Sequence, residues 1–268
     1  MLAAPSAWGA SEDEPAITPY RGNYLLPLSW THRPQPVPEA GIPASAFDRF
    51  EIKFQLSLKV AVWESIAGRN LDLYFAYTAR SFWQAYNDAN SKPFRDTNHE
   101  PEIFLRARWP RSWMPDEAPN VHWQLGINHQ SNGRALPLSR SWNRLIAGVD
   151  FPLGPVSTEF RAWWRFPEDP KEGPDDPEGD DNPDIEKYVG RTELSLRWAT
   201  DTLEYGLRWR SNWDFSKPRG SVLASLWFPI NDRLQGYAEV FSGYGESLID
   251  YNRSAERISV GIALNRWP

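Results

Sequence analysis

Three polar side chains near the middle of the chain have residue types and spacing suited to nucleophilic catalysis. His129 and Ser131 stand two positions apart, and Asn143 follows on the next segment of the chain. A serine hydroxyl is a weak nucleophile until a neighbouring base accepts its proton, and an imidazole can serve as that base. An asparagine beside the imidazole would hold its tautomer without adding a charge. The three residues are therefore a candidate Ser–His–Asn triad for acyl hydrolysis, with Ser131 as the nucleophile.

Two adjacent extended segments have to bring this triad together. His129 and Ser131 share the parity of one apolar series, and Asn143 shares the parity of a second. The first series is Val121, Trp123, Leu125 and Ile127, and the second is Leu145, Ala147, Val149 and Phe151. Antiparallel pairing of His129 with Asn143 puts both series on one face of a sheet, where opposite side chains lie ~5 Å apart at Cβ. We therefore expect the triad on the apolar face of a β-hairpin.

The composition excludes several classes of protein. The 268 residues include no cysteine, so neither a disulfide nor a thiolate metal site can form. The net charge is −6 and no basic stripe interleaved with aromatics occurs, which argues against nucleic acid as a partner. Mean hydropathy is −0.60, and no apolar run approaches the ~18 residues of a membrane helix. A soluble protein and a membrane β-barrel remain, because only alternate residues of a barrel strand meet lipid.

Long alternating segments favour the barrel. Phe50 to Val62 alternates apolar with polar side chains over about twice the length of a usual soluble strand. The polar positions are rich in Arg and Glu, and Trp and Tyr stand near the segment ends, as in a barrel with a charged lumen and aromatic girdles. A soluble β-sandwich or lipocalin-like barrel is the alternative, and strand length counts against it.

These segments number about twelve, and barrels of this class have an even number of strands. Similar alternation occurs near 71–77, 103–109, 121–131, 143–151, 156–166, 194–198, 203–209, 222–230 and 258–264, with a first strand near 23–30. The connections are alternately long (33–48, 84–100, 132–141, 167–187 and 245–255) and short (152–155, 200–202 and 231–233), as in bacterial outer-membrane barrels. We predict an all-β protein, a twelve-stranded antiparallel transmembrane β-barrel of the bacterial outer membrane. Residues 1–22 are expected to be a flexible N-terminal segment, and 23–268 the barrel domain.

The longest loop is acidic and rich in proline, from Pro167 to Asp184. A solvated outer loop is the first interpretation. A divalent-cation site using Asp180, Asp181 or Asp184 is the second, although no EF-hand spacing supports it.

Several sequence blocks resemble one known family. They are NHQSNGR (Asn128 to Arg134), SRSWNR (Ser139 to Arg144), PFRDTNHEP (Pro93 to Pro101), DDNPDIEKY (Asp180 to Tyr188) and FSGYGESLIDYN (Phe241 to Asn252). In these blocks, which follow the family's order, the chain is similar to outer membrane phospholipase A.

The resemblance implies a function and a set of site residues. The activity would be calcium-dependent hydrolysis of sn-1 and sn-2 acyl esters of phospholipids and lysophospholipids. The family's serine, histidine and asparagine fall on Ser131, His129 and Asn143, and the backbone N–H of Gly133 would bind the oxyanion. Calcium would be held by the carbonyls of Ser91 and Arg134 and by the Ser139 hydroxyl, the last supplied by the other subunit of a homodimer, so dimerisation would complete the site. Hard oxygen ligands suit this ion.

A non-catalytic outer-membrane pore or adhesin is the alternative function. A pore would place its functional polar groups in the lumen, whereas the triad is expected on the lipid-facing side. The direction in which these three side chains point therefore discriminates the two hypotheses.

Overall fold

The computed structural model describes residues 17–38, 41–110, 120–173, 176, 179–231 and 234–264. Almost all of its regular structure is β-strand, as the alternating sequence predicts. The strands are β1 (Ile17–Pro19), β2 (Tyr24–Thr31), β3 (Phe50–Trp63), β4 (Leu71–Trp83), β5 (Phe94–Arg108), β6 (His122–Ser131), β7 (Ser141–Leu153), β8 (Val156–Arg165), β9 (Thr192–Ala199), β10 (Glu204–Ser211), β11 (Gly220–Pro229), β12 (Gln235–Gly243) and β13 (Ala255–Ala263). The helical elements are one short α-helix, α1 (Ile185–Val189), and the 3-10 turns η2 (Ala44–Ala46), η3 (Ile66–Gly68) and η4 (Asp88–Asn90).

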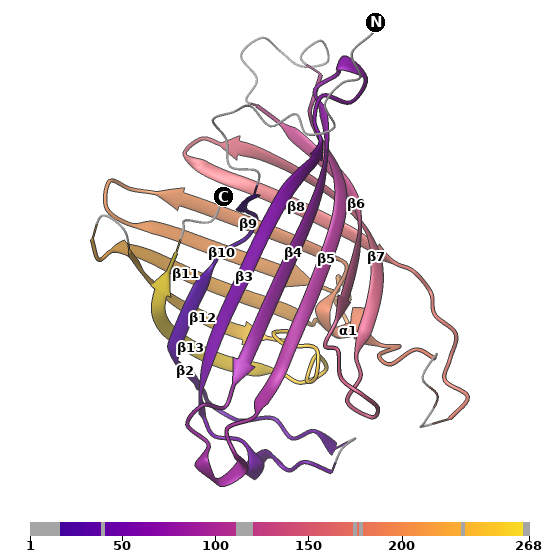
Figure 1. Cartoon of the computed structure of the whole chain (residues 1–268), viewed down its shortest axis with the longest axis vertical. Helices are drawn as coiled ribbons and strands as arrows, with labels where there is room; N and C mark the ends of the chain where they lie inside the picture. Colours follow the sequence, from indigo (N-terminus) through magenta and orange to yellow (C-terminus); the bar gives the residue numbers. More distant parts are fainter. Residues whose placement is uncertain are drawn as a thin grey trace, which may run out of the picture.

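The strands close into a barrel. From β2 to β13 each strand pairs antiparallel with its neighbours in the sequence, and β13 returns to pair with β2. Figure 1 shows the strands strongly tilted and wrapping round into a barrel. The predicted twelve-stranded antiparallel barrel is therefore confirmed.

The extra strand β1 lies along the same edge of β3 as β2 does. Pro19 pairs with Leu58, and Tyr24 pairs with Gln55. Between them the chain turns into the lumen, where Arg21 is buried. Residues 17–19 are thus paired with β3, and Arg21 and Asn23 are buried, while the boundary placed at residue 22 stays a prediction. Residues 1–16 lie outside the described residues.

The distribution of polar and apolar side chains is inverted relative to a soluble protein. On β3 the lumenal positions are buried and polar (Glu51, Lys53, Gln55 and Ser57), whereas Phe50, Leu56 and Val62 are exposed on the outside. Such an exterior is stable only in hydrocarbon, and the ionised lumenal groups are tolerated because they pair with one another. This arrangement rules out the soluble sandwich. None of the helices in the described ranges has the length and apolarity to cross a membrane.

The short turns lie at one end of the barrel and most of the longer loops at the other, at the bottom of Figure 1; the long connection 109–121 between β5 and β6 is the exception. The loop predicted at 84–100 is shorter in the structure, because β5 already begins at Phe94. At the loop end, α1 contributes Ile185 and Val189 to an apolar cluster with Trp142, Trp163 and Leu248. This cluster anchors the long connections against β7 and β8, next to the candidate triad.

Candidate active site

The β6–β7 hairpin pairs His129 directly with Asn143. The imidazole Nδ1 of His129 lies 2.8 Å from the amide Oδ1 of Asn143. Because an amide oxygen can only accept, Nδ1 carries the proton and donates it, which leaves Nε2 of His129 with its lone pair. The amide orientation is consistent with its other contact, in which Nδ2 of Asn143 donates to the Glu168 carboxylate at 3.2 Å. The tautomer is therefore the one that a general base needs at Nε2.

The pair faces out of the barrel. His129 and Ser131 share their side of β6 with Leu125 and Ile127, which are 43% and 52% exposed. Asn143 shares its side of β7 with Leu145, which is also exposed. The three side chains themselves are half-buried. The predicted face and the predicted register of the hairpin are both present.

A lumenal network fixes the two strands immediately behind the pair. Asn128, next to His129, donates to Glu100 at 3.0 Å and to Glu102 at 2.9 Å. Arg144, next to Asn143, donates to the Asn128 amide oxygen at 2.5 Å and to Glu100 at 3.0 Å. All four side chains are buried. Asn128 and Arg144 are each adjacent to a triad residue, and Glu100 and Glu102 bind them from β5, so the network holds the His129–Asn143 register from the inside.

Ser131 occupies the last residue of β6, on the same outward face as His129. Within the part of the chain that the structure describes, its hydroxyl makes no hydrogen bond to His129. Catalytic hydrogen bonds of this kind often tighten only when substrate is bound. The structure therefore brings His129 and Asn143 into contact and places Ser131 at the neighbouring outward position, without closing the third contact.

Glu168 is a neighbour of the site that the sequence does not reveal. It lies on the β8–β9 loop, outside the strands, and accepts from the Asn143 amide. Desolvation raises the pKa of the Glu168 carboxyl above its ordinary value, and the negative charge of Asp180 adds to the increase, whereas the Arg165 guanidinium opposes it. A proton is therefore held on Glu168 to a higher pH than on an exposed glutamate.

The residues expected to bind calcium lie on loops at the same end of the barrel. Gly133 and Ser91 both have a left-handed backbone, with φ of 61° and 59°. The Arg134 guanidinium donates to the carbonyl of Phe94 at 2.6 Å and to that of Arg95 at 2.9 Å. This contact ties the β6–β7 loop to the segment that follows Ser91. The carbonyls of Ser91 and Arg134 thus belong to two segments that are held against each other.

The described aspartates Asp180 and Asp181 of the acidic loop are paired with neighbouring side chains. Asp180 pairs with Arg165 at 2.6 Å, and Asp181 pairs with Lys171 at 2.8 Å and accepts the Ser139 hydroxyl. Among the residues described, no group of three His, Cys, Asp or Glu side chains is arranged to hold a metal ion. The loop carboxylates are instead used to anchor the loop, and the separate cation site considered for Asp180, Asp181 and Asp184 has no support.

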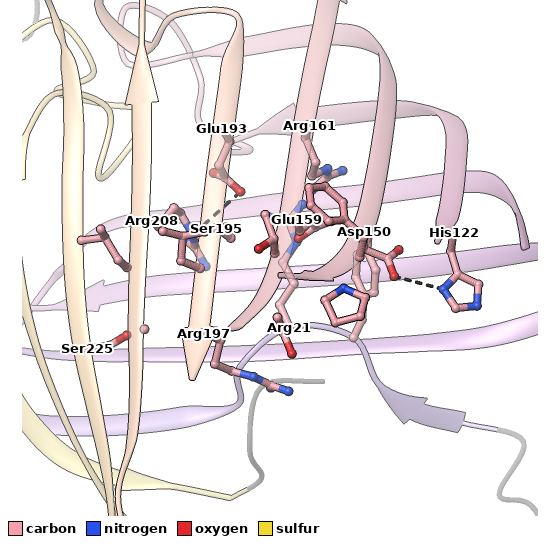
Figure 2. Close-up of a pocket in the computed structure, with 18 of the residues that line it drawn as sticks. Arg21, His122, Asp150, Glu159, Arg161, Glu193, Ser195, Arg197, Arg208 and Ser225 are labelled. Carbon is pink, nitrogen blue, oxygen red and sulfur yellow. Dashed lines mark hydrogen bonds and ion pairs between the residues drawn. The ribbon is translucent and has the colours of Figure 1, made fainter. Parts of the chain in front are cut away.

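A cavity of about 450 Å³ occupies the lumen toward the turn end (Figure 2). It is lined by charged side chains, including Arg21, Glu159 and Arg161, and by a His122–Asp150 pair at 3.2 Å. Arg106 also holds Asp150, at 3.0 Å, so this histidine–carboxylate pair is part of the lumenal ion network. None of the three triad residues lines this cavity, and the candidate active site is on the opposite side of the barrel wall.

Comparisons with known proteins identify one family over almost the whole chain. The family model described as Phospholipase A1 matches residues 6–264. Phospholipase A1 of Escherichia coli K12 is 35% identical over 249 residues, which covers 93% of this chain and 81% of the relative. Phospholipase A1 of Klebsiella pneumoniae is 35% identical over 251 residues, covering 93% and 82%.

Two solved structures share the fold. Outer membrane phospholipase A from Escherichia coli superimposes with a TM-score of 0.82 at 35% identity, over 93% of this chain and 98% of that one. The outer membrane phospholipase dimer of Salmonella typhi with bound calcium gives a TM-score of 0.83 at 33% identity, over 96% and 94%.

A closed twelve-stranded barrel with an ionised lumen and an apolar exterior defines an integral β-barrel protein of the bacterial outer membrane. Within that class, the family match and the relatives show that the chain belongs to the phospholipase A1 family. The resemblance read from the sequence is confirmed.

Proposed function

We propose that the protein is a calcium-dependent phospholipase of the outer membrane that uses Ser131, His129 and Asn143 on the outside of the barrel. The observation that carries the proposal is the outward-facing His129–Asn143 hydrogen bond, beside a serine and among side chains that face lipid. A pore would have no use for an oriented imidazole on its lipid-facing wall. The substrates are phospholipids and lysophospholipids, cleaved at the sn-1 and sn-2 esters.

The chemistry follows from the tautomer. The Ser131 oxygen attacks the ester carbonyl while its proton moves to Nε2 of His129, and Asn143 stabilises the imidazolium through Nδ1. The bond to the glycerol oxygen then breaks, and that oxygen takes the proton from Nε2. Water repeats the sequence on the acyl-serine: it gives a proton to Nε2, releases the fatty acid and restores Ser131. The backbone N–H of Gly133 donates to the oxyanion formed in each half.

The residues assigned to calcium fit a hard cation. Two backbone carbonyls and a hydroxyl are oxygen donors of the type that calcium takes. The Ser139 hydroxyl proton is committed to Asp181, so the lone pairs of its oxygen are free for a cation. When bound, the ion would polarise the ester carbonyl and stabilise negative charge on its oxygen.

A homodimer is part of the proposal, because the Ser139 hydroxyl would come from a second copy of the chain. Support comes from the Salmonella typhi structure, which is a dimer with bound calcium. Dimerisation and the arrival of phospholipid in the outer leaflet would then switch the enzyme on together.

The decisive experiment compares Ser131→Ala with a matched control, Ser195→Ala. Ser195 lines the lumenal cavity and not the candidate site. Fatty-acid release from phosphatidylcholine in detergent micelles is measured with calcium and with a chelator. We expect no release from Ser131→Ala and calcium-dependent release from Ser195→Ala. Full activity of Ser131→Ala would remove the triad, and channel conductance without any lipid hydrolysis would favour the pore.

A further inference from the structure

A second histidine faces Ser131 from the other side. In the β5–β6 pairing His99 is the direct partner of Ser131, on the strand opposite to the one that supplies Asn143. His99 shares its side of β5 with Ile103, which is 45% exposed, so its ring also lies on the outside of the barrel. Ser131 therefore has an imidazole on each side: His129 along its own strand, and His99 across the sheet.

One edge of the His99 ring is held by a tyrosine. The hydroxyl of Tyr77, on β4, lies 2.6 Å from Nδ1 of His99, and the two rings stack with centroids 6.2 Å apart. A phenol can donate or accept, and we assign its O–H as the donor to Nδ1, which leaves Nε2 with the hydrogen of the neutral imidazole. In this assignment the tautomer is opposite to that of His129, and Nε2 of His99 donates where Nε2 of His129 accepts.

The free edge of His99 points to the end of β6. A Cβ built on Gly133 would lie 3.8 Å from Cδ2 and 4.0 Å from Nε2 of His99. Gly133 has a φ of 61° and no side chain, so the imidazole edge lies close to the backbone there. Nε2 of His99 and the backbone of Gly133, the proposed oxyanion donor, are therefore neighbours just beyond the end of β6.

We propose that His99 is a catalytic residue of this site: its neutral Nε2–H donates a hydrogen bond to the scissile ester oxygen as that oxygen becomes negative. This rests on the proposed function, because it requires Ser131 to be the nucleophile. No proton is transferred; His99 stays neutral and Tyr77 fixes its tautomer and plane. The oxyanion would then receive protein donors from two strands, β5 as well as the loop after β6.

The magnitude follows from the known cost of losing one such donor. Removing an oxyanion donor from a water-excluded site lowers kcat roughly 100-fold to 1,000-fold. His99 is half-buried and shares the task with the Gly133 N–H. We therefore expect His99→Phe to lower kcat about 10-fold to 100-fold with little change in KM.

The test uses four variants of the whole protein refolded in detergent micelles with calcium. His99→Phe keeps a flat ring without an N–H, His99→Gln restores an amide N–H, and Tyr77→Phe removes the hydroxyl that sets the tautomer. His122→Phe, in the lumen, is the matched histidine control. The substrate is an uncharged p-nitrophenyl acyl ester, and a phosphatidylcholine is measured in parallel. The rate of labelling of Ser131 by a long-chain sulfonyl fluoride is the readout that does not depend on turnover.

We expect low kcat and slow labelling for His99→Phe, substantial rescue in His99→Gln, a smaller loss in Tyr77→Phe, and an unchanged control. Activity of His99→Phe within about three-fold of the wild type, with Ser131→Ala inactive, would overturn the role of His99 and leave the triad intact. A defect confined to phosphatidylcholine, or to KM, would also overturn it, because that pattern belongs to a headgroup contact. An active Ser131→Ala would overturn both proposals. If His99→Phe does not fold, His99→Gln and Tyr77→Phe still test the proposal. Equally large losses of kcat in these two variants would contradict the role of His99 as a donor.

Discussion

Replacing Asn143 with alanine tests the hydrogen bond between this residue and His129, the one triad contact that is formed among the residues the structure describes. The change removes the 2.8 Å bond between Nδ1 of His129 and the amide oxygen. A neutral hydrogen bond contributes about 0.5–1.5 kcal/mol net, and one to a charged partner about 1.5–3 kcal/mol. His129 becomes charged only after it accepts the serine proton, so Asn143 favours the transition state over the ground state by about 1–2 kcal/mol.

That difference sets the expected result. At about 1.4 kcal/mol for each factor of ten, kcat of Asn143→Ala should fall roughly 5-fold to 30-fold, with KM nearly unchanged. The assay is hydrolysis of an acyl ester in calcium-containing micelles, with Val149→Ala as the control on the same outward face of β7. A fall below two-fold would mean that the imidazole is oriented by something else. A fall above about 1,000-fold would mean that Asn143 does more than orient it.

A second variant at the same position separates hydrogen bonding from charge. Asn143→Asp keeps an acceptor for His129 but replaces the amide that donates to Glu168 with a second carboxylate. Like charges this close repel, so we expect Asn143→Asp to be less active than its stronger acceptor would suggest. Adding Glu168→Gln to it should restore activity. A double variant no better than the single one would show that the two carboxylates do not meet.

Three further predictions concern the loops around the site. Burial raises the pKa of the Glu168 carboxyl above 4.5, so its contribution to stability is present at low pH and is lost as pH rises through the folded-state pKa. Glu168→Gln should flatten this pH dependence of the unfolding free energy, measured by urea titration of the refolded barrel. The pKa of Glu246 is about 2: burial would raise it, but the charges of Arg257 and Lys53 outweigh burial. Its stabilisation is therefore present above pH 4.5 and is lost as pH falls from 4.5 toward 2, and Glu246→Gln should remove that part of the acid sensitivity. Arg134→Ala removes both bonds to the segment after Ser91, so the calcium concentration for half-maximal activity should rise several-fold with little change in the unfolding midpoint.

Much of the fold can be predicted from alternation alone, because a membrane barrel separates polar and apolar side chains at every residue. The long strand β3 shows this without interruption. The start of β5 was missed for a physical reason: Arg95 and Asp96 are buried in the lumen, and the outward positions Thr97 and His99 are polar too. Near the end of the barrel the outer face no longer has to be apolar, so the signal disappears while the strand continues. The inward turn at Arg21 depends on a partner on β3 and has no local signature.

In the candidate site, too, contacts within one hairpin could be predicted from the sequence, whereas contacts from distant segments could not. His129 and Asn143 could be paired from parity within one hairpin, because the two apolar series must lie on the same face of the sheet. Glu168 approaches from a long loop, and His99 from a strand whose register is set elsewhere, so no spacing in the sequence predicts either contact. The lumenal bond between Asn128 and Arg144 has no distinctive sequence signal either, because most lumenal positions carry polar side chains.

Along β6, residues that hold the strand in place from the lumen alternate with residues proposed to carry out the reaction on the outside. Asn128 and Gln130 face the ionised interior, and His129 and Ser131 face the lipid. Inserting or deleting one residue in this strand would exchange the two sets, with amides in hydrocarbon and the imidazole among guanidinium groups. Length variation among natural homologues should therefore collect in the loop at 132–140, while β6 itself admits only point changes or frame-restoring pairs of insertions.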